Sequence, residues 1–389
     1  MSSKGVISRG IPAPIIKEGD DIVNIVVDSI LKETEIDKGS EPGVVLLKGN
    51  YVFKGKTFNK IKYRTNIMPI TEYDLNDNDV IGITESIIAR AAGQYVSVDD
   101  IATWIIKRFG PAAEIIIDSP IYSRNRFSMI LKGIARAAKK LYFVMPPVDE
   151  VGNPSGVNPF TGVNIQEYYK SICDGENCES VFGDQLYIAT ASITDKEINN
   201  WPYIYCGLHD YAKWKEQFGN ATHITLADIC SDVSPDWGLL GTNKSTEERL
   251  KLFPSKEEAQ RVCDEIKNKL IEKTGANVIV CCYGDGCFHD PVANIWEWAD
   301  PTTMPAYTDK ELIESTPNEI KLKAFIDEGV TEDEIQKLID EKNKNLVGSM
   351  TSQGTTPRLF RDLLASLMDL TSGSGDRATP IILIQNYFR

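Results

Sequence analysis

The sequence lacks the long apolar runs and the basic excess that would link a protein to membranes or nucleic acids. No window approaches the roughly 18 uninterrupted apolar residues of a membrane span, and the start, MSSKGVISRGIPAP, has no signal-peptide core. A net charge of -14 and a pI near 4.9 leave no basic footprint for nucleic acid or anionic lipid. We therefore expect a cytoplasmic protein with neither nucleic-acid nor membrane partners.

Two common nucleotide signatures are also missing. The chain has no Walker A loop and no GxGxxG sequence that opens a helix, which disfavours the two commonest nucleotide-binding folds. Histidine is scarce, and none of the three has a recognisable partner for a Cys-His nucleophile: His209, His223 and His289. Any polyanionic ligand must therefore be held by local donors or by a metal.

Cysteine is present in modest number without the spacing of a disulfide framework or of a standard zinc motif. A zinc interpretation would combine four neighbouring residues with two distant cysteines: Cys281, Cys282, Cys287 and His289, with Cys173 and Cys178. Since two of these candidates fall inside an apolar strand pattern, we favour reduced, mostly buried thiols.

The most informative stretch is residues 274–300. Residues 277–282 are apolar and β-branched, as in a strand covered on both faces, and a polar loop containing Gly284, Asp285 and Gly286 follows. Open α/β sheets place ligands just beyond the carboxyl ends of their strands. Gly-Asp-Gly is also ordinary turn chemistry, so the loop has both a functional and a purely structural interpretation.

The remaining pattern alternates strands and helices, which predicts an α/β fold with mixed (α+β) sheets. We expect a hairpin within residues 34–64 and an acidic helical hairpin within 308–345, the latter interpretable simply as a solvated appendage. Expected strands include 80–83, 141–145, 186–191 and 381–384; expected helices include one from 22 onward, 99–109, 126–140, 195–199, 256–272 and 358–370.

Two further segments carry candidate ligand groups. Asp149 and Glu150 follow an apolar strand, inside the polar loop 146–162. Hard carboxylate oxygens of this kind suit Mg²⁺ or Mn²⁺ carrying a nucleotide phosphate, provided that they meet Asp285. The glycine and hydroxyl loop near the carboxyl end offers backbone amides to phosphate, or is only a flexible connector: Ser372, Gly373, Ser374 and Gly375.

Several of these stretches, in this order, resemble the deazaflavin-coenzyme (coenzyme F-420) γ-glutamyl ligases, the CofE-like proteins. PIIKEGDDI resembles the family's amino-terminal segment, and DNDVIGITESIIARAAGQ resembles its strand-to-helix segment. VIVCCYGDG occupies the place of a strand that ends in an Asp-Thr-Phe-Gly loop, and TPIILI that of the closing strand. The order of the motifs carries the resemblance more than any one of them.

The resemblance implies a two-part ligase core over residues 1–293 and 351–389, with insertions near 34–64 and 160–250 and an inserted helical segment at 294–350. It implies GTP (or GDP), a divalent Mg or Mn ion, a small-molecule acceptor, L-glutamate and a homodimer. The implied metal ligands are Asp149 and Asp285. The implied nucleotide contacts are Ala13, Pro14, Ile15, Ile16, Glu85, Ser86, Arg90, Asn153, Ser372, Gly373, Ser374, Gly375 and Thr379.

The implied activity joins glutamate to an acidic, phosphorylated acceptor through an acyl phosphate, with Arg90 and Asp285 as catalytic groups. Two positions depart from the family pattern: Arg90 stands where lysine is usual, and Gly286 replaces a threonine. One alternative is therefore a non-catalytic nucleotide-binding relative that acts through a protein partner. Another is a phosphatase or hydrolase built on the same acidic metal site.

Overall fold

The computed structural model divides the chain into two compact units, Met1–Ala91 with Lys256–Arg389, and Ala92–Ser255. We call these unit 1 and unit 2. The residues that the structure describes are 5–31, 44–53, 56–64, 75–122, 126–150, 152–158, 162–184, 200–208, 210–284, 288–290, 295–297, 303–314, 327–334, 337, 358–372 and 378–388.

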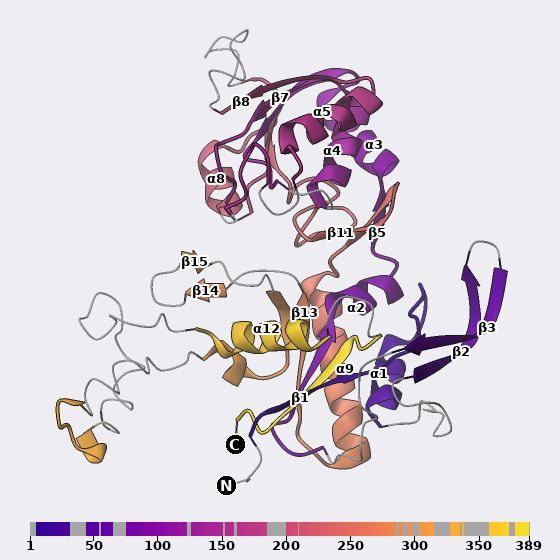
Figure 1. Ribbon diagram of the computed structural model, residues 1–389, viewed down its shortest axis with the longest axis vertical. Helices are drawn as coiled ribbons and strands as arrows, with labels where there is room; N and C mark the ends of the chain where they lie inside the picture. The colour runs from indigo at the N-terminus through magenta and orange to yellow at the C-terminus, as the bar shows by residue number, and fades with distance from the viewer. Residues whose placement is uncertain are drawn as a thin grey trace. The chain divides into compact units, whose positions relative to one another are not determined.

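Unit 1 is built on a five-stranded mixed sheet (Figure 1). In spatial order the strands are β1 (Ile7–Ile11), β17 (Ile381–Gln385), β4 (Val80–Thr84), β13 (Ile279–Gly284) and β16 (Thr303–Tyr307). Only β4 and β13 among these neighbours run parallel, with Thr84 opposite Tyr283. The carboxyl ends of these two central strands therefore meet at one edge of the sheet.

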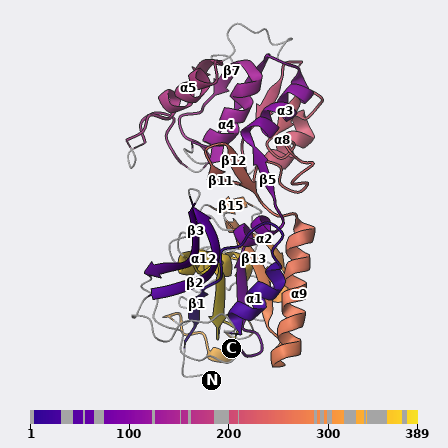
Figure 2. The same ribbon diagram turned by 90° about the vertical axis from the view of Figure 1, so that its right-hand side faces the viewer.

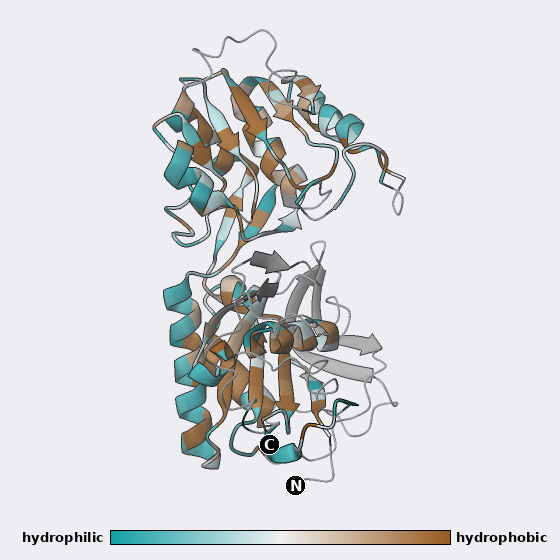
Figure 3. Ribbon diagram, turned by 90° about the vertical axis from the view of Figure 1, so that its left-hand side faces the viewer, coloured by the Kyte–Doolittle hydropathy of each residue, from teal (hydrophilic) through white to brown (hydrophobic). Residues whose placement is uncertain are grey.

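Helices cover both faces of this sheet (Figures 1 and 2). The helices α1 (Ile22–Ile30) and α9 (Lys256–Thr274) pack on one face, and α12 (Phe360–Ser372) packs on the other. Because strand side chains alternate, the adjacent Cys282 and Cys281 enter opposite layers. Figure 3 shows the apolar strands between helices that are polar on their outer sides.

Close packing fixes α12 against the central strand. A side chain at Gly82 of β4 would place its Cβ only 2.2 Å from Met368 Sδ of α12. A larger residue at this point would force the Met368 side chain to shift, so glycine lets the helix approach the sheet closely. The contact positions the carboxyl end of α12, at Ser372, near the strand ends.

Unit 2 contains a second sheet of five parallel strands. In spatial order they are β10 (His223–Thr225), β9 (Tyr203–Tyr205), β6 (Ala113–Asp118), β7 (Ala138–Val144) and β8 (Glu179–Gly183). The chain proceeds outward from β6 to β8 and then returns to the other side at β9. In such doubly wound sheets, the strands flanking this reversal open the crevice in which ligands usually bind.

One face of this second sheet is covered by α3 (Val98–Phe109), α4 (Arg126–Ala137) and α5 (Ile165–Gly175). The other face carries an aromatic cluster in which Trp214 of α8 (Tyr211–Phe218) stacks on Tyr205, with ring centroids 4.9 Å apart. A small antiparallel sheet joins β5 (Tyr95–Ser97), β12 (Arg249–Leu252) and β11 (Thr242–Thr246).

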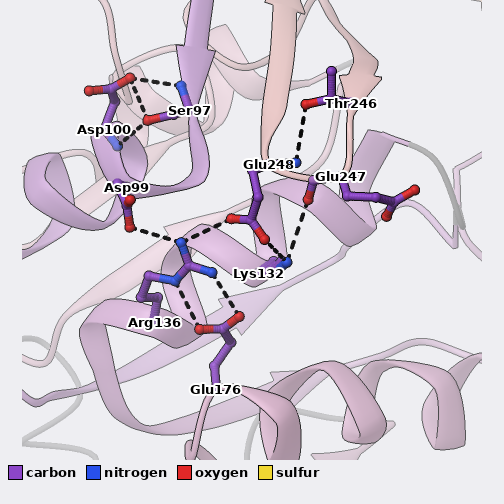
Figure 4. A network of polar contacts seen from close by, with 9 residues as sticks. All are labelled: Ser97, Asp99, Asp100, Lys132, Arg136, Glu176, Thr246, Glu247 and Glu248. Carbon is purple, nitrogen blue, oxygen red and sulfur yellow. Dashed lines mark hydrogen bonds and ion pairs between the residues drawn. The ribbon is translucent and has the colours of Figure 1, made fainter. Parts of the chain in front are cut away.

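A polar network ties the helices of unit 2 together (Figure 4). Arg136 of α4 donates two hydrogen bonds to Glu176, at 2.9 and 3.0 Å, and one to Asp99 of α3 at 2.8 Å. It also donates to Glu248, in the turn between β11 and β12, at 3.1 Å. These carboxylates raise the pKa of Arg136 further, so it stays charged at every physiological pH.

The remaining elements of unit 1 lie outside its five-stranded sheet. The helix α2 (Glu85–Ala91) directly follows β4, and two hairpins are formed by β2 (Val44–Phe53) with β3 (Lys56–Arg64) and by β14 (Phe288–Asp290) with β15 (Ile295–Glu297). A 3₁₀ helix, η1 (Lys310–Ile313), precedes α12. Among the described residues, no helix combines the length and the apolar character needed to cross a bilayer.

The predicted mixed α/β fold is confirmed, with sheets of both kinds flanked by helices. The strand-to-helix junction at residue 84 and the hairpin within 34–64 are also present. The predicted helix 126–140 was three residues too long, because β7 already begins at Ala138. The expected elements 186–191 and 195–199 lie outside the described residues, as do most of 308–345 and 294–350, and the predicted domain division stays a prediction.

Candidate functional site

A cavity of about 340 Å³ lies in unit 1, where β4 and β13 end. Its volume is within the range of small-molecule sites in proteins. Four separate segments of the chain line it, and the described lining residues are Ala13, Pro14, Ile15, Ile16, Thr84, Ser86, Ile87, Arg90, Tyr283, Ser372, Ala378, Thr379 and Pro380. The cavity thus brings together most of the residues that the sequence associated with nucleotide binding.

Backbone hydrogen bonds hold these segments in place. The amide of Ala13 donates to the carbonyl of Ala378 at 3.2 Å, and the amide of Thr84 donates to the carbonyl of Pro380 at 3.0 Å. Ala378 has a positive φ of 53°, a conformation that a non-glycine residue adopts at some cost. The carboxyl-terminal segment is therefore fixed against both the amino-terminal loop and the end of β4.

Gly10 allows Thr379 to reach the cavity wall. A Cβ atom at Gly10 would lie 2.8 Å from both the Cβ and the Oγ1 of Thr379, too close for another side chain. Thr379 itself is buried and its hydroxyl donates to the carbonyl of Ser372 at 3.4 Å. This bond spans the two ends of the loop that the sequence proposed as a phosphate cradle.

Arg90 is the charged side chain among the described lining residues. Its Nε donates to the carbonyl of Ile16 at 3.2 Å, which anchors the amino-terminal loop to α2. No ion pair of Arg90 is found within the described part of the chain. A guanidinium held in this way keeps its terminal N–H groups for a ligand, and these match the oxygens of phosphate or carboxylate.

Two predicted members of the nucleotide set have other surroundings. Glu85 begins α2 but is buried, with 3% exposure, and is not among the lining residues. Asn153 belongs to unit 2, where its backbone and side-chain nitrogens donate to Asp149 at 2.8 and 3.0 Å. Through these two hydrogen bonds, Asn153 stabilises the loop to which it belongs.

Asp149 is the most strongly bonded carboxylate of that loop. Besides the two bonds from Asn153, it accepts one from the backbone amide of Tyr122 at 2.9 Å, and it is 7% exposed. Each of these three bonds comes from a neutral N–H group. A buried, oriented carboxylate is chemically suited to a hard divalent ion.

A second acidic group at the same end of the parallel sheet was missed by the sequence analysis. Asp118 ends β6, next to the strand reversal, and accepts hydrogen bonds from the Tyr203 hydroxyl at 2.5 Å and the Ser119 hydroxyl at 3.1 Å. Burial raises the pKa of Asp118, and these two hydrogen bonds only partly oppose the rise. The signal was an aspartate at the end of the apolar run 115–117.

Glu150 lies close to the other strand of the reversal. Its carboxylate accepts from the Leu208 amide at 2.8 Å and from the Tyr205 hydroxyl at 3.4 Å. Gly207 is required between them, because a Cβ there would lie 2.3 Å from Glu150 Oε1. Acidic and phenolic groups therefore lie together at the carboxyl ends of β6 and β9.

Several predicted site residues lie outside the described part of the chain: Asp285, Gly286, Gly373, Ser374 and Gly375, with Cys287. The pairing of Asp149 with Asp285 therefore stays a prediction. The described cysteines are buried and unbridged, as expected: Cys173, Cys178, Cys206, Cys230, Cys263, Cys281 and Cys282. The opposite orientations of Cys281 and Cys282 argue against a shared zinc ion.

The fold and the cavity define a mixed α/β protein with a ligand site at the ends of its central strands. The sequence matches the family F420-0:Gamma-glutamyl ligase over residues 47–386, and the chain belongs to that family. This membership makes it an amide-bond-forming ligase of the γ-glutamyl type, as the motif order predicted. No curated protein matches the sequence.

Proposed function

We propose that the protein uses GTP and a divalent metal ion to join L-glutamate, through its amine, to a carboxylate of an acidic phosphorylated small molecule. The observation that supports this most directly is the cavity of unit 1. Residues from four distant segments, including Ile15, Ser86, Arg90 and Thr379, converge on it. The described wall combines one cation with hydroxyl groups and apolar side chains, and the cation and hydroxyl groups are suited to a nucleotide phosphate chain.

The reaction needs two displacements. The γ-phosphate of GTP passes to the acceptor carboxylate, giving an acyl phosphate, and the glutamate amine then displaces phosphate to form the amide. Here Arg90 offsets charge on the transferred group, while the Ser86 hydroxyl orients phosphate oxygens by hydrogen bonding. The residues of the chain thus position the reactants and neutralise charge, which is most of what phosphoryl transfer requires.

Asp149 and Asp285 would hold the Mg²⁺ or Mn²⁺ ion. Asp149 suits such an ion, because it is a buried carboxylate oriented by three N–H groups. When bound, the ion would supply positive charge to the phosphate oxygens. An acidic chain, with net charge -14, needs that charge to approach a polyanionic substrate.

A cytoplasmic location, inferred from the sequence composition, and a homodimer, by analogy with the family, complete the proposal. The acidic composition and the absence of a membrane-spanning helix among the described residues are consistent with it. Neither observation identifies the acceptor. The family name nevertheless supplies a first one to try, the coenzyme precursor F420-0.

Turnover tests the proposed function. Purified protein is given GTP, Mn²⁺, L-glutamate and the F420-0 precursor, and phosphate release and product mass are followed. We expect phosphate release that requires all four components, with a product heavier by one or more glutamyl groups. Phosphate release that does not depend on glutamate and acceptor would instead indicate a hydrolase. The absence of phosphate release would contradict the proposal. Replacing GTP by ATP tests the choice of nucleotide.

A further inference from the structure

A second cavity, of about 350 Å³, lies in unit 2 and shares no described lining residue with the cavity of unit 1. Its volume is again within the range of small-molecule sites. Its described polar lining residues are Arg108, Lys215, Asn220, His223 and Asp228. Two permanent cations and one carboxylate therefore surround a cavity in a chain whose net charge is -14.

The ends of three elements supply these side chains. Arg108 is in the last turn of α3, Lys215 is in the last turn of α8, and His223 is the first residue of β10, an edge strand of the parallel sheet. A cation in the last turn of a helix is also favoured by the helix dipole. Lys107 provides this for α3 as well as Arg108 does, so the dipole alone does not explain an arginine at the cavity.

Three of the polar side chains already have structural functions. Asn220 Oδ1 accepts from the amide of His223 at 3.0 Å, and Asp228 Oδ2 accepts from the amide of Thr225 at 2.9 Å, so both cover the outer edge of β10. The other oxygen of Asp228 accepts from Lys215, which holds that ammonium group beside the cavity. Both carboxylate oxygens thus have partners other than Arg108.

Arg108 has no such function. Its side chain is exposed, and within the described part of the chain it has neither a hydrogen bond nor an ion pair. An exposed arginine is stable in water alone, but this one lies on a cavity wall that also includes the Lys215 ammonium. Its planar guanidinium offers five N–H donors in the geometry that matches the oxygens of a carboxylate or a phosphate.

We propose that this cavity binds an oxyanion, the phosphate or carboxylate group of a small molecule, with Arg108 as the bidentate donor. Lys215 supplies the second positive charge, since an ammonium group has three N–H donors and Asp228 takes one of them. The inference goes beyond the proposed function, because the cavity belongs to unit 2 and its lining residues are separate from those of the nucleotide cavity.

Proton NMR of the histidine rings in the full chain tests the proposal at the cavity itself. The chain has only three histidines, and His223→Gln identifies the resonance of the one that lines the cavity. Inorganic phosphate and L-glutamate are titrated separately, at constant pH and at an ionic strength held with sodium chloride. We expect the His223 resonance to shift saturably with at least one of them, and that anion identifies the ligand group.

Arg108→Gln should raise the dissociation constant for that anion about tenfold or more, because a charged hydrogen-bond donor is lost. Lys107→Gln is the matched control. Lys107 is in the same helical turn, is also exposed and loses the same charge, but it is not among the lining residues. This control should keep the wild-type dissociation constant, and both variants should keep the wild-type melting temperature.

Three results would overturn the proposal. A His223 resonance that neither anion shifts saturably would show that the cavity takes no oxyanion. Equal dissociation constants for the wild type and Arg108→Gln would exclude the guanidinium from the site. Equal weakening in Arg108→Gln and Lys107→Gln would attribute the effect to the general field of the helix end. GTP binding at unit 1 is measured separately, so this inference and the proposed function can fail independently.

Discussion

Asp118 shows how a single residue can matter without a recognisable motif. Asp149 and Asp285 were predicted as ligands because each follows an apolar strand pattern in a polar loop, whereas Asp118 ends the short apolar run 115–117 and is followed by Ser119 and Pro120. What distinguishes it is burial beside Tyr203, a contact of residues 85 positions apart. Such a contact depends on strand pairing, which composition and spacing do not reveal.

The raised pKa of Asp118 makes a prediction about stability and pH. Since burial lifts its folded-state pKa above the ordinary value of 3.8, the folded protein binds more protons than the unfolded chain just above that pH. Stability contributed by this group is therefore lost as the pH rises through the folded-state pKa. Asp118→Asn, which stays neutral, should escape that loss.

Denaturant unfolding of the wild type and of Asp118→Asn, from about pH 4 to pH 7, measures the effect. We expect the variant to be the more stable protein at neutral pH, with the difference shrinking toward the acid end. Asp232→Asn serves as the control, because Asp232 is an exposed aspartate of the same unit. A pH-independent difference between the wild type and Asp118→Asn would show that the buried charge is not its cause.

The secondary-structure elements were predictable where a long apolar or amphipathic pattern decided them. The strands near 80 and 381 and the helix from residue 256 have clear periodicity, and each was predicted within a few residues. The strands β6 and β9 were not predicted. The strand β9 has only three residues, Tyr203–Tyr205, which is too short for a recognisable pattern. Their stability comes from pairing in a parallel sheet rather than from local preference.

The arginine network of Figure 4 gives a prediction at the scale of elements. Arg136 joins α4 to Glu176, Asp99 and Glu248, and its side chain is 27% exposed while that of Glu176 is 15% exposed. Arg136→Met keeps much of the packing but removes the bidentate bond. We expect a loss of about 1–2 kcal/mol in the free energy of unfolding, measured by denaturant titration.

Lys170→Met is the comparison for this network. Lys170 forms an exposed pair with Asp174 on α5, at 2.7 Å, and both side chains are more than half exposed. Removing such a pair should change stability by no more than about 0.5 kcal/mol. Equal losses for Arg136→Met and Lys170→Met would mean that partial burial adds nothing to the network.

For the whole molecule, the order of motifs predicted more than any single motif did. Residues 14–22, the junction at 84, and the loop at Ser372 with the strand 379–384 were associated by resemblance, and the structure brings parts of all three to one cavity. The parallel sheet of unit 2 was not foreseen, because residues 160–250 were interpreted as an insertion. These residues supply β8, β9 and β10, three of the five strands of that sheet.

The central claim is that the cavity of unit 1 binds the nucleotide, and calorimetric titration of GTP in the presence of Mg²⁺ tests it most directly. We predict saturable binding to the wild type, weakened about tenfold or more in Arg90→Gln because a charged hydrogen-bond donor is lost. Arg261→Gln, on the exposed side of α9, should bind like the wild type. No binding to the wild type, or equal binding to Arg90→Gln, would contradict the account.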